Sequence, residues 1–236
     1  MSNDDRPRAT IRLRPAPGTR PGTGTRRAAP PAPPVPPAPE EPRLPAARTE
    51  TPLTRSAPRA RVTGRGVLRV NLNRPPGTGA DLDLGCMAAF HDGSRAAVQP
   101  LGNSFGSLAE WPYMELDQDD RTGASSDGET VRVDLERREL FRRLLFHVYV
   151  YSGAVDFRTL GATATVTAPS GGFRIALDDS PAGATGCAVA LAEPGEGGLT
   201  ITREVRWFTG TARHSVQEQM DTAYGFGLTW VRARKD

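Results

Sequence analysis

The chain has 236 residues and a formal net charge of +3, a length that accommodates one ordinary domain with additional sequence, or two small domains. No apolar run approaches the roughly 20 residues needed to cross a bilayer, and the N-terminus lacks the apolar core of a secretory signal. Neither a transmembrane segment nor secretion is therefore predicted.

The first 60 residues differ in composition from the rest of the chain. They hold 15 of the 22 prolines and a net charge of +6, whereas all 15 aromatic residues and a net charge of −3 lie beyond them. A stretch with so much proline and no aromatic residue cannot bury a core. We predict a disordered, Pro/Arg-rich arm over residues 1–62 and a folded domain over residues 63–236. The mildly acidic domain argues against a nucleic-acid-binding face.

The arm contains a proline-rich segment, Pro30–Pro39, in which P-x-x-P spacings overlap. Proline fixes φ and lacks an N–H donor, so the segment favours an extended polyproline II rod. Such a rod is either a stiff spacer or a ligand for an aromatic groove on a partner. The sequence leaves both roles open.

Beyond the arm, short strands separated by turns follow one another. Alternation of apolar and polar residues is typical of strands with one buried face, and a near-continuous apolar run is typical of a central strand. The second pattern occurs in residues 144–151 (LLFHVYVY). The predicted strands are residues 66–72, 82–90, 95–99, 130–135, 144–151, 162–167, 173–177, 186–192, 199–208 and 228–232.

Helical patterns are few. Residues 136–143 form one short candidate, and residues 215–223 form another, with a serine start and Gln and Glu in the first turn. A chain of many strands with so few helices predicts an all-β fold. We expect a sandwich of two antiparallel sheets with one or two short helices.

One loop is unusually acidic. It carries five acids against a single arginine, and these acids are Asp117, Asp119, Asp120, Asp127 and Glu129. Carboxylates so close together repel one another and raise each other's pKa. A hard divalent cation removes that penalty, and calcium accepts six to eight oxygen ligands in irregular geometry. Because His and Cys are absent nearby, zinc and copper are not favoured.

A second acidic pair, Asp81 and Asp83, begins the predicted strand 82–90. Residues two apart on a strand point to the same face, so both carboxylates could reach the loop if the two segments are neighbours. The loop does not fit an EF-hand, because Arg121 stands at position 5 and Glu129 at position 13. The alternative to a metal site is a solvated acidic turn whose aspartates cap backbone N–H groups.

These acidic segments belong to blocks that resemble the TerD-domain family of tellurium-resistance and stress-response proteins, in particular its TerA branch. The family usually has Asn at the position of Asp120, and a denser run of acids where Ser125 and Ser126 stand. The matching blocks are residues 79–85 (GADLDLG), 101–107 (LGNSFGS), 116–129 (LDQDDRTGASSDGE), 202–207 (TREVRW) and 224–227 (YGFG).

The resemblance implies a calcium-binding β-sandwich without catalysis. It also implies a role in tellurite tolerance and stress response, within assemblies of other Ter-type proteins and a membrane partner. We expect a cytoplasmic scaffold, free or peripheral to the membrane; the alternative is a metal-independent interaction module recruited by its arm. Carried over by position, the ligands would be Asp119, Asp120, Asp127 and Glu129 from the loop and Asp81 and Asp83 from the strand, and Asp117 is added for its proximity and charge.

Three residue types bear on catalysis. Residues 102–106 (GNSFG) match the G-x-S-x-G nucleophile elbow, which would make Ser104 a hydrolase nucleophile. That elbow requires a strand-to-helix turn, whereas strands are predicted after it, so an enzyme is not expected and a Ser104 hydrolase is the remote alternative. His147 is expected to be a packed, hydrogen-bonded histidine. Cys86 and Cys187 are expected to be buried free thiols of a reducing compartment.

Overall fold

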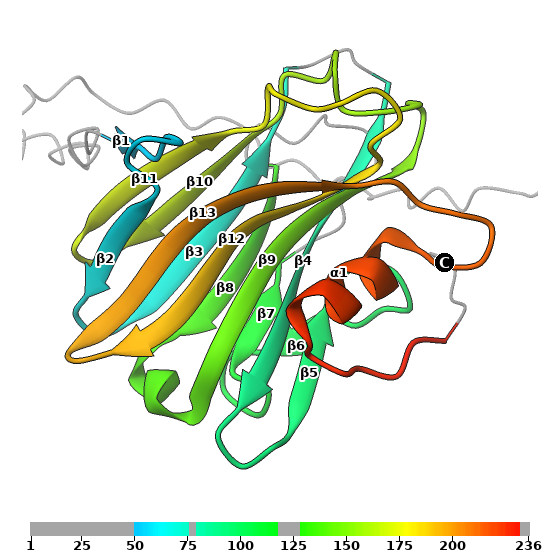
Figure 1. The fold of residues 1–236 in the computed structure, drawn as a ribbon. Coiled ribbons are helices and arrows are strands. Elements are labelled where there is room, and N and C mark those ends of the chain that lie inside the picture. Colours follow the sequence, from blue (N-terminus) through cyan, green and yellow to red (C-terminus); the bar gives the residue numbers. More distant parts are fainter. Residues whose placement is uncertain (1–49, 76–78, 118–127, 232–236) are drawn as a thin grey trace, which may run out of the picture. The chain divides into compact units, whose positions relative to one another are not determined.

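The computed structural model describes residues 50–75, 79–117 and 128–231. Their strands form two sheets that pack face to face (Figure 1). One sheet has seven strands in the order β1-β11-β10-β3-β8-β7-β6, and the other has six in the order β2-β13-β12-β9-β4-β5. The prediction of an all-β sandwich is confirmed.

All neighbouring strands in the described residues are antiparallel except β1 and β11, which pair in parallel. The seven-stranded sheet contains β1 (Glu50–Pro52), β11 (Gly171–Ala176), β10 (Thr163–Ala168), β3 (Val67–Asn73), β8 (Glu129–Asp134), β7 (Met114–Leu116) and β6 (Gly106–Ser107). The six-stranded sheet contains β2 (Arg59–Thr63), β13 (Gly198–Phe208), β12 (Gly186–Gly195), β9 (Phe141–Ser152), β4 (Asp81–Phe90) and β5 (Arg95–Val98).

The two sheets differ in how many of their faces are buried. Strands β3, β8 and β10 bury every second residue, as expected for a sheet with one solvated face. In contrast, every residue of β4 is buried, and so is most of β9. Their inward side chains join the core between the sheets, and their outward ones, such as Met87 and Leu145, form a second apolar cluster.

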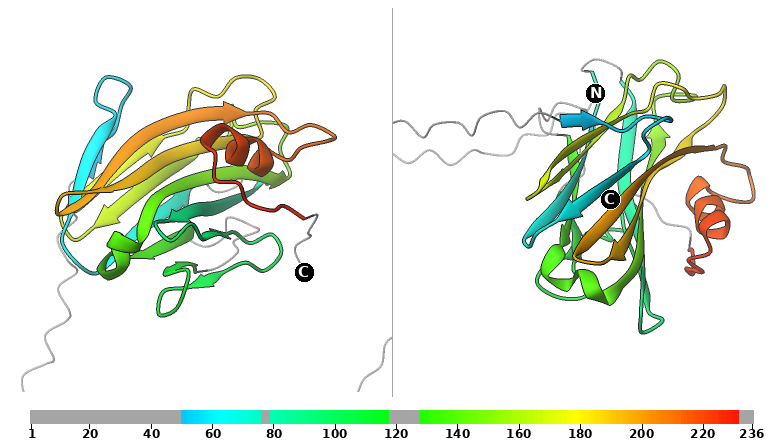
Figure 2. Two further views of the ribbon diagram at one scale, coloured as in Figure 1. Left: turned by 60° about the horizontal axis from the view of Figure 1, so that its bottom comes forward. Right: turned by 60° about the vertical axis from the view of Figure 1, so that its left-hand side comes forward.

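Helix α1 (Val216–Tyr224) covers this second cluster. Val216 and Met220 pack on it, and Figure 2 shows the helix on the side of the six-stranded sheet that faces away from the other sheet. The helix begins with a capping box between Ser215 and Glu218, as the sequence predicts. No helix in the described ranges is long and apolar enough to cross a bilayer.

The segment after α1 is not a strand in the described residues, so the predicted strand at 228–232 is wrong over residues 228–231. The buried carboxylate of Asp221 accepts hydrogen bonds from the backbone N–H of Gly227 (2.6 Å) and of Leu228 (2.9 Å) and from the indole N–H of Trp230 (2.8 Å). These bonds tie the segment to the helix. Its N–H groups are therefore used by a side chain rather than by a neighbouring strand.

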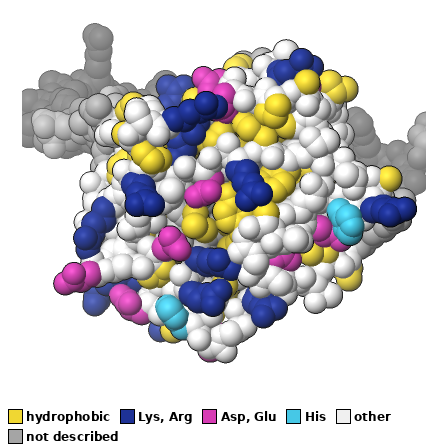
Figure 3. Space-filling model, in the orientation of Figure 1, with side chains coloured by type: hydrophobic (Ala, Val, Ile, Leu, Met, Phe, Trp, Pro, Cys, Tyr) yellow, Lys and Arg dark blue, Asp and Glu magenta, His cyan; other side chains and the backbone are white. Residues whose placement is uncertain are grey.

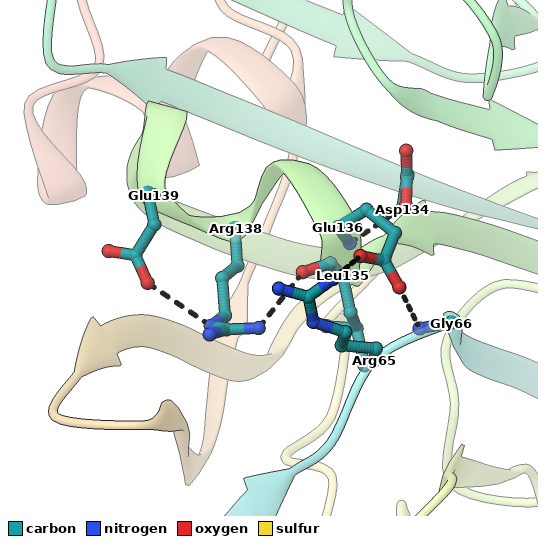
Figure 4. Close-up of polar contacts among 7 residues, drawn as sticks. All are labelled: Arg65, Gly66, Asp134, Leu135, Glu136, Arg138 and Glu139. Atoms are coloured by element: carbon teal, nitrogen blue, oxygen red, sulfur yellow. Dashed lines mark hydrogen bonds and ion pairs between the residues drawn. The ribbon is translucent and has the colours of Figure 1, made fainter.

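The other predicted helix, residues 136–143, is a 3₁₀ helix, η1 (Leu135–Leu140), and β9 begins directly after it. Asp134 caps it by accepting a hydrogen bond from the N–H of Glu136 (2.8 Å). The Glu136 carboxylate in turn accepts from the N–H of Gly66 at 3.2 Å (Figure 4). These contacts hold the turn before β3 against the turn before β9.

The described sandwich begins at Glu50, so the predicted boundary between arm and domain at 62/63 falls inside it. Strands β1 and β2 both begin before residue 63, and Leu53 between them is buried. Arg55 pairs with Asp179 at 2.5 Å, which fixes this segment to the body. Strand β1 (ETP) is short and has no apolar residue besides proline, and two of the five residues of the edge strand β2 (RARVT) are arginines. Neither has the apolar pattern that predicts a strand. Residues 1–49 lie outside the described residues.

Candidate metal site

Four of the seven predicted ligands fall within the described residues. Asp81 and Asp83 lie at the start of β4, Asp117 follows β7, and Glu129 begins β8. Each therefore comes from the end of a strand, where the sheet can hold a side chain in place. The remaining three, Asp119, Asp120 and Asp127, lie outside the described residues.

The two ends of the acidic loop are held together at its base. The Asp117 N–H donates to the Thr130 carbonyl at 3.0 Å, and the Thr130 N–H donates to Asp117 Oδ1 at 2.8 Å. Next to this pair, Gly128 has φ +61°, and a Cβ there would lie 2.0 Å from the Leu72 carbonyl oxygen on β3. Only glycine fits this approach. The loop therefore leaves the sandwich from a fixed base that β7, β8 and β3 build.

Glu129 connects the two sheets. It belongs to the seven-stranded sheet, yet its Oε2 accepts a hydrogen bond from the backbone N–H of Leu84, on β4 of the six-stranded sheet, at 2.7 Å. Its side chain is nearly completely buried. A charged acceptor makes this bond stronger than one between neutral groups. It also brings the carboxylate beside the strand that carries Asp83.

The two aspartates of β4 are buried as well: Asp83 is 0% exposed and Asp81 is 6% exposed. The register between β4 and β9 shifts between Asp81 and Leu82, because β9 has one extra residue there, Tyr151. That both aspartates share one strand face stays a prediction. Asp83 is the cross-strand neighbour of Tyr149 on β9.

The pKa of the Tyr149 hydroxyl responds to the negative charge of this region. Burial raises the pKa of its hydroxyl well above its usual range, and the charges of Asp83 and Glu129 raise it further. Carboxylates from both sheets therefore act on the same hydroxyl. The sequence did not single out Tyr149, but its place in the apolar run 144–151 was the available signal.

The described carboxylates do not complete a metal site by themselves. Within residues 50–75, 79–117 and 128–231, no three Asp, Glu, His or Cys side chains gather as a metal-binding group. The set of seven ligands stays a prediction, because three of them fall outside these ranges. The oxygen donors that are described suit a hard cation rather than zinc or copper.

His147 is packed, as expected, but it is not hydrogen-bonded. It is 0% exposed, it stacks on Tyr149 with ring centroids 6.2 Å apart, and neither ring nitrogen has a hydrogen-bond partner among the described residues. Burial lowers its pKa to about 4, so the ring is neutral at pH 7. Gly85 lies against the ring, because a Cβ there would be 2.6 Å from His147 Nε2.

The other chemically interesting side chains are engaged or buried. Ser104 donates a hydrogen bond to the Ala97 carbonyl at 2.9 Å, and the next element is the short strand β6 instead of the helix that a nucleophile elbow needs. Both cysteines are free and buried, as predicted. Burial raises the pKa of the Cys86 and Cys187 thiols, which keeps them in the unreactive thiol form.

Fold and site together define a class: a β-sandwich with buried carboxylates at the base of an acidic loop. No model of a known family matches the chain. The tellurium resistance protein TerA from Alcaligenes sp. is 30% identical over 185 residues, which cover 72% of this chain and 53% of that protein. The chain thus spans about half the length of this curated relative. It belongs to the TerD-like tellurium-resistance family, as its motifs predict.

Two solved structures resemble the chain in fold. One is a protein of unknown function, with a TM-score of 0.49 and 16% identity. The other is a homologue of the telluride resistance protein TerD from Streptomyces coelicolor A3(2), with a TM-score of 0.46 and 19% identity. Each match covers 64% of this chain and 94% of the other. Because both scores are below 0.5, these two matches carry no further argument.

Proposed function

We propose that this chain is a calcium-binding, non-catalytic scaffold that acts in tellurium resistance and stress response through assembly with other proteins. The single observation that carries the proposal is the position of Glu129. Its carboxylate is buried at the base of the acidic loop and bridges the two sheets through the Leu84 N–H. A cation bound there would stabilise loop and sandwich together.

The donor set fits calcium. Asp81, Asp83 and Glu129 are at least nine-tenths buried, and burying several negative charges in one region is unfavourable unless positive charge is supplied. Calcium supplies two positive charges and takes carboxylate oxygens in irregular geometry. The bond from Leu84 N–H to Glu129 Oε2 fixes the position of this carboxylate at the base of the loop.

The proposed consequence of binding is an ordered acidic loop at the edge of the sandwich, which we call the rim. The fixed base at Asp117 and Thr130 would set the direction of the loop, and the loop acids would complete the ligand set. The rim would then present a surface to a partner. The partners we propose are other Ter-type proteins and a membrane protein. The assembly would then lie at the cytoplasmic face of the membrane. Engagement of Ser104 and burial of both thiols support a role without catalysis.

Calorimetric titration of the full chain with calcium tests this proposal. We expect wild-type protein, freed of metal with a chelator, to bind calcium with a measurable heat. The double substitution Asp127→Asn and Glu129→Gln is expected to abolish that heat. Glutamine retains an oxygen that can accept from Leu84 N–H, so the variant removes charge while leaving the bridge between the sheets possible.

Asp134→Asn is the matched control, because this aspartate lies at the far end of β8 and caps η1. It should bind calcium as wild type does. Absence of any binding heat at millimolar calcium would contradict the proposal. So would equal binding by the wild type and the double variant.

A further inference from the structure

A hollow of about 700 Å³ lies where the loop before α1 meets the segment after it, and nothing in the proposed calcium function uses it. It adjoins a second hollow of about 500 Å³, lined in part by β5 and the turn that follows it, and the two share Gln99, Leu101, Trp230 and Val231. A volume of this size is typical of sites for small molecules.

Both polar and apolar side chains line the two hollows. Trp230, Leu101 and Val231 line both, and Trp111 and Pro112 line the second. Val231 is 79% exposed and Trp111 is 54% exposed. Figure 3 shows apolar side chains gathered on the face of the six-stranded sheet, interspersed with basic and acidic ones. Exposed aromatic and aliphatic groups around a hollow favour a flat apolar ligand.

One wall is preformed by the anchored C-terminal segment. Trp230 is held by the bond between its indole N–H and Asp221, whose other bonds fix Gly227 and Leu228. The helix that carries Asp221 is itself fixed by its capping box. A wall that is already ordered loses little conformational entropy when a ligand binds.

Gln99 offers an acceptor without a donor where the two hollows join. Gln99 is only 8% exposed. Its Nε2 donates a hydrogen bond to the Leu101 carbonyl at 3.4 Å, which sets the orientation of the side-chain amide. Its Oε1 is buried and accepts no hydrogen bond from any described residue. A buried acceptor in this state is unfavourable, and a ligand N–H or O–H that reaches it removes the penalty.

The charged groups around the first hollow favour an anion. Arg213 and His214 line it and are exposed, and no carboxylate in the described part of the chain forms an ion pair with Arg213. The one acid on the wall, Glu218, is already engaged, because its carboxylate accepts from the Ser215 N–H at 2.6 Å. The available charge on this wall is therefore positive.

From these observations we infer that the joined hollows bind a small aromatic anion that carries an N–H or O–H donor. The ring system lies against Trp230 and Leu101, the donor meets Gln99 Oε1, and the negative group faces Arg213. The residues that line this site include none of the predicted calcium ligands, and we expect its occupation not to depend on calcium.

The probe for this site is 6-anilinonaphthalene-2-sulfonate, which is an aromatic anion with one N–H donor that lies far from its own sulfonate. Its N-methyl derivative is the matched ligand without that donor. We expect the full chain to bind the anilino compound at one site, and roughly tenfold more tightly than the compound that lacks the N–H. Gln99→Met should remove most of this difference, because methionine has similar length and no amide oxygen.

Arg213→Gln should weaken both ligands several-fold and reduce the effect of salt on binding. Arg61→Gln is the control, since Arg61 lies on β2, at the opposite edge of the sheet from β5. Equal affinity of wild type for the two ligands, or equal effects of Arg213→Gln and Arg61→Gln, would overturn the inference. Both comparisons remain decisive if Gln99→Met does not fold.

Discussion

Replacement of Gly128 by alanine is expected to destabilise the protein by about 3 kcal/mol. Two effects add at this position. The backbone has φ +61°, which L-residues other than glycine adopt only at a cost of about 1 kcal/mol or more. In addition, the new Cβ would lie 2.0 Å from the Leu72 carbonyl oxygen, so β3 and β8 would have to separate. Chemical denaturation at pH 7 measures the change in unfolding free energy.

Gly79→Ala separates the two effects. Gly79 has nearly the same φ, +63°, but, apart from its two chain neighbours, no heavy atom of the described residues lies within 4 Å of the position of its Cβ. We expect this variant to lose about 1 kcal/mol, which is the backbone term alone. Equal destabilisation of both variants would contradict the close approach between Gly128 and β3. It would also contradict the fixed base of the acidic loop, which depends on that approach.

His147 is expected to make the fold sensitive to acid. Its folded pKa of about 4 lies below the unfolded value of about 6.5, so the unfolded chain binds the proton more readily. The contribution of the neutral imidazole to the free energy of unfolding is fully present above pH 6.5, and it declines as the pH falls towards 4. The loss amounts to about 3 kcal/mol over that interval.

The variant His147→Leu removes this titration and leaves an apolar side chain on the sheet. Unfolding free energies measured by denaturant titration at several pH values should fall less steeply below pH 6.5 than those of wild type. His91→Gln alters an exposed histidine of the turn after β4 and should keep the wild-type profile. Parallel profiles for wild type and His147→Leu would show that the imidazole is not buried in neutral form.

Much of the sandwich was predictable because its inner strands have strong patterns. The alternation in β3 and β8 and the apolar runs of β4 and β9 indicate burial on one face or on both. The short strands β1, β6 and β7 carry only two or three residues, too few for any period to emerge. The segment around Trp230 has a strand-like pattern, but the buried carboxylate of Asp221 captures its N–H groups.

The candidate site was predictable in its residue types and not in its geometry. Acids at close spacing indicated the loop and the start of β4 from sequence alone. The bond from Leu84 N–H to Glu129 joins strands of different sheets, and no local pattern encodes such a contact. The isolated state of the His147 nitrogens likewise depends on what packs around the ring.

Thermal unfolding of the full chain in calcium and in chelator tests the central claim, calcium binding at the base of the acidic loop, most directly. We predict a clear stabilisation by calcium, about 2.7 kcal/mol at a hundredfold excess over the dissociation constant. The stabilisation should be absent when Asp127→Asn is combined with Glu129→Gln. Identical melting of the wild type in calcium and in chelator would contradict the account.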